Sequence, residues 1–210
     1  MTRTCIAAIF WLLAVAPTSD HLFAPNAAGG LPPFWQLAVK EGRPIVRAET
    51  IDETPAVCLD SDASSFSIQR RTNINLRRTP MLHLQWRVDT LPPGADFRTS
   101  KDDQAAQFFV AFATPLRYRA INYIWDTTAP VGAIGDYNLL WFIKIKTVVV
   151  ESGAQHKGMW QEVTRDVRHD YADLFGGDAP AVRGVRFQVN SQYTHSHVVG
   201  CLAKADFADH

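Results

Sequence analysis

A group of acidic side chains lies close along the chain to an aromatic residue, Trp160. Four carboxylates belong to this group: Glu151, Glu162, Asp166 and Asp170. Glycoside cleavage uses two carboxyl groups about 5 to 10 Å apart across the sugar, a separation that spacing along the chain does not establish. Asp166 and Asp170 would also share one helical face beside Arg165, as in an ordinary capped and ion-paired helix. We favour that structural interpretation and name no catalytic residue.

Tryptophans could stack on a sugar ring, although buried tryptophans are commoner. The chain has six. Trp86 belongs to an inward-facing set, whereas Trp125 ends an alternating strand beside an aspartate and Trp160 follows Gly158 out of a loop. Asp103 stands at the entry to an apolar strand and could bind a cation or a partner arginine. The ligand-binding residues that we predict are Trp125, Trp160, Asp103, Arg165 and Asp170.

Motifs for metal or cofactor chemistry are missing from the sequence. His195 and His197 would share one face of a strand, as in cupin-like metal sites, but no carboxylate follows between Val198 and Lys204. We therefore expect a solvated histidine pair and no metal ligand. The sequence has no nucleophile elbow, phosphate loop, dinucleotide fingerprint or zinc signature, which weakens an enzyme interpretation and predicts no cofactor.

The N-terminus has the order of a secretory signal peptide, which we assign to residues 1–19. Arg3 precedes the apolar run Cys5 to Ala16, and polar residues follow. Cleavage near Ala16, Ser19 or Ala24 remains open. The run is too short to span a bilayer, and the mature chain has no second one. We expect an exported protein, periplasmic or secreted.

Export would leave two cysteines in the mature chain, Cys58 and Cys201. Two cysteines in an oxidising compartment are consistent with one disulfide, but two buried unpaired thiols remain an alternative. The 21 basic and 21 acidic residues give a net charge of +0 and are interspersed. This pattern argues against nucleic acid or acidic lipid as a partner.

Residue alternation predicts a mostly β protein. Leu82, Leu84, Trp86 and Val88 alternate with polar residues, and Val185, Phe187 and Val189 do the same around Arg186 and Gln188. The run 105–112 is apolar enough for a strand covered on both faces. One short helix is expected at 166–175, capped by Asp166 and ended by Gly176. We predict an antiparallel β-sandwich over residues 34–210, preceded by a flexible lead-in at 20–33.

Several motifs between Phe34 and Phe207 carry a family resemblance. They are Leu84, Trp86, Arg87 and Val88; Leu91, Pro92, Gly94, Ala95 and Asp96; Asp102, Asp103 and Ala105; Tyr123 and Trp125; Val149, Glu151, Ser152 and Gly153; Gly158 and Trp160; and Arg165, Asp166, Val167, Asp170, Tyr171, Phe175 and Gly176. With these motifs the chain resembles the bacterial family of domain of unknown function 3047. Its strand layout is similar to galactose-binding-like jelly rolls, which implies that fold. Many such sandwiches hold a calcium ion through an acidic residue where this chain has Lys204, which argues against calcium there.

Three functions remain open from the sequence. The first is a binding module for a glycan or envelope polysaccharide, because of the fold analogy and the two candidate tryptophans. The second is a carbohydrate-active hydrolase or lyase that uses Glu151 or Glu162 with Asp166 or Asp170. The third is a structural or assembly protein of the envelope. We favour the binding module.

Overall fold

The computed structural model describes residues 19–25, 30–114, 117–140 and 142–210. The predicted signal peptide thus lies outside the described residues apart from Ser19. The described residues form thirteen strands and one helix: β1 (Ser19–Phe23), β2 (Gln36–Glu41), β3 (Ile45–Ile51), β4 (Thr54–Asp62), β5 (Ser65–Ile74), β6 (Met81–Thr90), β7 (Ala106–Thr114), β8 (Arg117–Asp126), β9 (Ile134–Leu140), β10 (Ile143–Ser152), β11 (Gln161–Asp166), α1 (Val167–Phe175), β12 (Val182–Asn190) and β13 (His197–Ala208).

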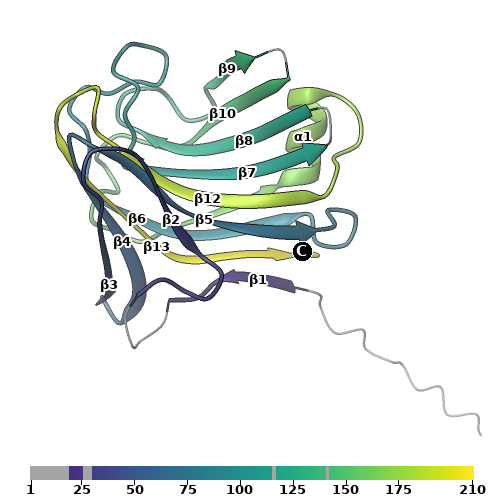
Figure 1. Cartoon of the computed structure of the whole chain (residues 1–210), viewed down its shortest axis with the longest axis horizontal. Helices are drawn as coiled ribbons and strands as arrows, with labels where there is room; N and C mark the ends of the chain where they lie inside the picture. The colour runs from purple at the N-terminus through teal and green to yellow at the C-terminus, as the bar shows by residue number, and fades with distance from the viewer. Residues whose placement is uncertain (1–18, 26–29, 115–116, 141) are drawn as a thin grey trace, which may run out of the picture.

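The strands form two sheets that pack face to face (Figure 1). The six-stranded sheet has the order β11-β6-β13-β4-β3, with β1 paired to β13. The seven-stranded sheet has the order β2-β5-β12-β7-β8-β10-β9. The predicted β-sandwich with one short helix is therefore confirmed.

One strand pair departs from the antiparallel expectation. β10 runs parallel to β8 and antiparallel to β9. The chain leaves β8, runs back along the sheet edge as β9, and then inserts β10 between the two. A strand inserted in this way must point in the same direction as β8. Alternation along the sequence shows which residues share a face but says nothing about the direction of a neighbouring strand.

The core lies between the sheets and follows the period-two pattern. Leu82, Leu84, Trp86 and Val88 of β6 are buried against Phe187 and its neighbours from the other sheet. Burying each such side chain stabilises the fold by about 1.5–3 kcal/mol. The same alternation places Arg186 and Gln188 on the outer face of the seven-stranded sheet.

The predicted flexible lead-in at 20–33 needs a correction, because its first residues form β1. Leu22 and Phe23 are buried, and Trp35 Nε1 donates a hydrogen bond to the Leu22 carbonyl at 2.8 Å. The Phe23 and Trp35 rings meet edge to face with their centroids 5.0 Å apart. Apolar side chains thus help to hold β1 against β13.

The helix α1 forms where the sequence predicts it. Asp166 caps it by accepting a hydrogen bond from the His169 amide at 2.9 Å, and Gly176 ends it with a φ of 75°. Tyr171 packs against Phe112, so α1 closes one end of the sandwich beside β7. Within the described residues, no helix has the length and apolar character needed to cross a membrane.

Candidate functional site

Trp125 does not line a cleft, which corrects the expectation from the sequence. Its side chain faces the core with 0% exposure, and its indole N–H donates to the Gly153 carbonyl at 3.0 Å. The alternation of residues along β8 does not determine which of its two faces is turned toward the core. The structure assigns the apolar face, which includes Tyr123 and Trp125, to the interior.

Trp160 is half-buried on the outer face of the six-stranded sheet, where it covers a disulfide. Cys58 of β4 and Cys201 of β13 are cross-strand partners joined by an S–S bond, and Trp160 packs against their cluster. The indole N–H donates to the Ile51 carbonyl at 3.3 Å. The disulfide alternative for the two cysteines is thus the correct one.

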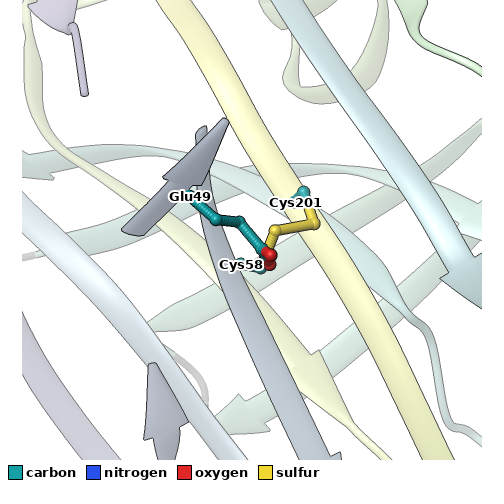
Figure 2. A group of neighbouring side chains, drawn as sticks. All are labelled: Glu49, Cys58 and Cys201. Atoms are coloured by element: carbon teal, nitrogen blue, oxygen red, sulfur yellow. A yellow bond between two sulfur atoms is a disulfide. The ribbon is translucent and has the colours of Figure 1, made fainter. Parts of the chain in front are cut away.

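The Glu49 carboxylate points toward this disulfide (Figure 2). One of its oxygens and the two sulfurs lie within 4.8 Å of one another, a spacing that could suit a metal ion. However, each sulfur is already bonded to the other, and thiolates rather than disulfide sulfurs are the ligands that metals take from cysteine. In its oxidised form this cluster has no cysteine donor to offer.

Asp103 is fully buried and joins two loops. Its Oδ2 accepts hydrogen bonds from the Thr194 amide at 2.6 Å and the Thr194 hydroxyl at 2.7 Å. Its Oδ1 accepts from Asn190 Nδ2 at 3.1 Å. These contacts fasten the loop after β12 to the segment before β7. Its oxygens are therefore occupied by protein donors.

Arg165 and Asp170 form an ion pair that also includes the core hydroxyl of Tyr123. Arg165 donates to both Asp170 oxygens, at 2.9 and 2.6 Å, and the Tyr123 hydroxyl donates to Oδ2 at 2.6 Å. Burial, together with the nearby Asp170 charge, raises the pKa of Tyr123 well above its usual range. The pair joins β11 to α1. The five predicted ligand residues thus do not converge on one site.

A groove lies instead on the outer face of the seven-stranded sheet. It has a volume of about 1060 Å³ and is lined from β2, β5, β7, β8 and β12. The lining residues are Phe34, Gln36, Gln69, Arg70, Arg71, Phe109, Ala111, Tyr118, Arg183, Gly184, Val185 and Arg186. Aromatic rings, side-chain amides and guanidinium groups therefore face the same hollow.

Strand register explains why a hollow forms there. Across β5, β12 and β7, one row consists of Gln69, Arg186 and Phe109. The next row on the same face consists of Arg71, Gly184 and Ala111. Gly184 has no side chain and Ala111 has only a methyl group, so these neighbouring positions leave a depression beside the row of larger side chains. Residues two apart along a strand share a face, so these rows line one surface.

Phe34 forms an aromatic lip of the groove. Its side chain is 79% exposed, its φ is 69°, and the Arg70 guanidinium lies 5.4 Å from its ring centroid. A left-handed conformation costs a bulky residue about 1 kcal/mol or more and persists only when its surroundings impose it. The neighbouring Trp35 anchor imposes it here, and an apolar ring is held in solvent beside the groove.

Tyr118 contributes a polar group as well as a ring. Burial raises the pKa of Tyr118, and the nearby Arg186 opposes this effect. The hydroxyl therefore stays protonated at neutral pH and can donate one hydrogen bond. Gln36 and Gln69 can both donate and accept. Such groups match the hydroxyls and apolar ring faces of a sugar.

The sequence analysis missed this groove although two signals for it were present. The alternation of β12 placed Arg186 on a wet face, and Phe109 interrupted the expected alternation of β7. The predicted strand over residues 105–112, covered on both faces, would make Phe109 a core residue. Its ring is instead only partly buried and faces outward beneath Arg186. Which strands become neighbours was not visible along the chain.

The carboxylates considered for catalysis lie elsewhere. Glu151 accepts from the Ser152 amide and contacts His156 at 3.1 Å, Glu162 is exposed on β11, and Asp166 caps α1. None of the described residues lining the groove is a carboxylate. The groove therefore offers no acid and nucleophile pair for glycoside cleavage.

Comparison with known proteins places the chain in a family. Residues 35–205 match the family described as "Protein of unknown function (DUF3047)". The chain belongs to this family, which confirms the resemblance seen in its motifs. None of the curated protein sequences compared with the chain matches it.

Solved structures of carbohydrate-related proteins share the fold. The xyloglucanase domain of NopAA from Sinorhizobium fredii, in complex with cellobiose, matches with 9% identity and a TM-score of 0.50 over 90% of this chain and 96% of that one. A mutant of carbohydrate-binding module CBM29-2 with mannohexaose gives 9% identity and 0.47 over 93% and 94%. The family 11 xylanase from Neocallimastix patriciarum gives 9% and 0.46 over 91% and 100%. At such identities the likeness concerns the fold alone.

Proposed function

We propose that this protein binds a polysaccharide chain in the groove on the outer face of its seven-stranded sheet. The observation that carries the proposal is the composition of the groove. Phe34, Phe109 and Tyr118 offer aromatic surface, and Gln36 and Gln69 offer amide groups beside it. Sugar recognition needs this combination, because a pyranose has apolar C–H faces and a rim of hydroxyls.

The shape of the site favours a chain over a compact ligand. The groove is lined from five neighbouring strands of the seven-stranded sheet, so it extends across them. The likeness to a glycanase domain is consistent with such a ligand but is an analogy of fold.

Binding outside the cytoplasm forms part of the proposal. The Cys58–Cys201 disulfide is a bond that forms and persists in oxidising compartments. The N-terminal signal pattern predicts the same location. A polysaccharide of the cell envelope or the surrounding medium is then the ligand that the protein would meet.

Affinity electrophoresis through gels containing plant and bacterial polysaccharides, together with a glycan array, tests the proposal. Ala111→Leu fills the groove without changing its charge, and Gly184→Val does so from the adjacent strand. Thr50→Leu, at an exposed position of β3 in the other sheet, is the matched control. We expect at least one polysaccharide to retard the wild type and Thr50→Leu but neither groove variant. Absence of retardation by any polysaccharide, or unchanged retardation of both groove variants, would overturn the proposal.

A further inference from the structure

The groove concentrates positive charge on a chain with a net charge of +0. Arg70, Arg71, Arg183 and Arg186 line it, and no described lining residue is acidic. Surface charges of one sign raise each other's energy unless counterions or a ligand offset them. The neutral overall composition of the chain therefore does not explain why these arginines lie together.

Some arginines elsewhere in the described chain are neutralised by carboxylates. Five of them pair in this way: Arg47 with Asp60, Arg77 with Asp178, Arg87 with Asp52 and Asp89, Arg98 with Asp96, and Arg165 with Asp170. Within the described residues Arg43, Arg78, Arg119 and Arg168 form no salt bridge, but they do not lie together in one groove. In the described part of the chain, none of the four groove arginines forms a salt bridge. Their full charge therefore remains available to a ligand.

Protein contacts hold three of these arginines without neutralising them. Arg70 donates to the Leu22 carbonyl at 2.7 Å, and Arg183 donates to Asn73 Oδ1 at 2.5 Å. The Arg186 guanidinium lies 5.5 Å from the Phe109 ring centroid, so the ring orients it. Arg71 is exposed on the adjacent row. A guanidinium has five N–H donors, and because the Arg70 Nε is buried, the donors available to a ligand belong mainly to Arg71, Arg183 and Arg186.

We infer that the ligand of this groove is an acidic polysaccharide, bound through its carboxylate or sulfate groups by Arg71 and Arg186; this inference rests on the proposed function. Arginine suits the task because its planar fork of N–H donors can bind a carboxylate or sulfate through two hydrogen bonds. Aromatic groups on the same surface then contact the sugar rings between the charges. A neutral glycan would leave the guanidinium charges of Arg71 and Arg186 without an acidic partner.

Two pairs of polymers that differ only in charge test the inference by isothermal titration calorimetry. The first is polygalacturonate and its methyl ester, and the second is dextran sulfate and dextran. We expect at least one acidic polymer to bind about tenfold or more tightly than its neutral partner, with an affinity that falls as salt rises. The double variant Arg71→Gln/Arg186→Gln should bind that polymer about ten- to a hundredfold more weakly. Arg168→Gln/Lys157→Gln, at exposed positions away from the groove, removes the same charge and should bind like the wild type.

The remaining outcomes separate the inference from the proposed function. Equal binding of a neutral polymer and its acidic partner would overturn the inference and leave the proposed function standing. Failure of every polysaccharide would overturn both. Binding of polyglutamate or single-stranded DNA as tightly as the acidic glycan would overturn the inference too, because it would show that charge alone is recognised.

Discussion

Arg186 of β12 lies over the ring of Phe109 on β7, with its guanidinium carbon 5.5 Å from the ring centroid. The two residues are register partners on the outer face of the seven-stranded sheet. The ring helps to fix the position of the guanidinium, so both groups are held on the same face of the sheet. This pair forms the centre of the proposed glycan groove.

Phe109→Ala should therefore weaken polysaccharide binding about tenfold, since it removes an aromatic contact and releases Arg186. Tyr137→Ala, at an exposed aromatic position on β9 outside the groove, is the matched control and should bind normally. Titration calorimetry with the best polysaccharide measures both. Equal losses in the two variants would contradict the assigned role of Phe109.

Asp170→Asn should lower the free energy of unfolding by about 2 kcal/mol without changing polysaccharide affinity. The substitution breaks a pair that is partly screened, because the Arg165 side chain is 36% exposed. Tyr123→Phe, which removes only the hydroxyl donor, should cost about 1 kcal/mol. Urea unfolding gives the stabilities. If the Asp170→Asn variant folds but binds the polysaccharide less tightly, the prediction is wrong and Asp170 belongs to the ligand site.

The double variant Cys58→Ala/Cys201→Ala should lose about 2–5 kcal/mol of stability. The disulfide joins residues 143 apart in sequence, so it constrains a long loop of the unfolded chain. The check is urea unfolding with and without a reducing agent. Reductant should destabilise the wild type once it unfolds and should leave the variant unchanged. Equal stability of the two proteins under oxidising conditions would show that the bond contributes nothing.

Acid should weaken the fold through Asp96. Two hydrogen bonds from the Arg98 side chain, at 2.8 and 2.6 Å, hold the pKa of Asp96 well below its ordinary value. Because the pKa is lower in the folded state, ionised Asp96 stabilises the protein above the ordinary aspartate pKa of about 4. That contribution is lost as the pH falls from there through the folded-state pKa.

The unfolding free energy, measured from about pH 7 to about pH 3, should thus fall less steeply at the acid end for Asp96→Asn than for the wild type. Asp62→Asn, at an exposed position, is the matched control and should follow the wild type. Parallel curves for Asp96→Asn and the wild type would contradict the assignment.

Local patterns in the sequence were sufficient for the elements and much of the core. Period-two alternation identified β6 and β12, and Asp166 with Gly176 marked the ends of α1. These features depend on residues close together along the chain, such as a cap and the amide it accepts from. The family motifs likewise lie within short segments, and they agreed with the match over residues 35–205.

Tertiary structure alone decided the candidate site. Alternation shows that Trp125 shares a face with Tyr123, but it does not say that this face is the interior. It also cannot show that β5 pairs with β12, a contact that makes Gln69 the register partner of Arg186 and places Arg71 in the adjacent row. The charge of the groove arises from that pairing, because arginines dispersed in a neutral sequence gather only when their strands become neighbours.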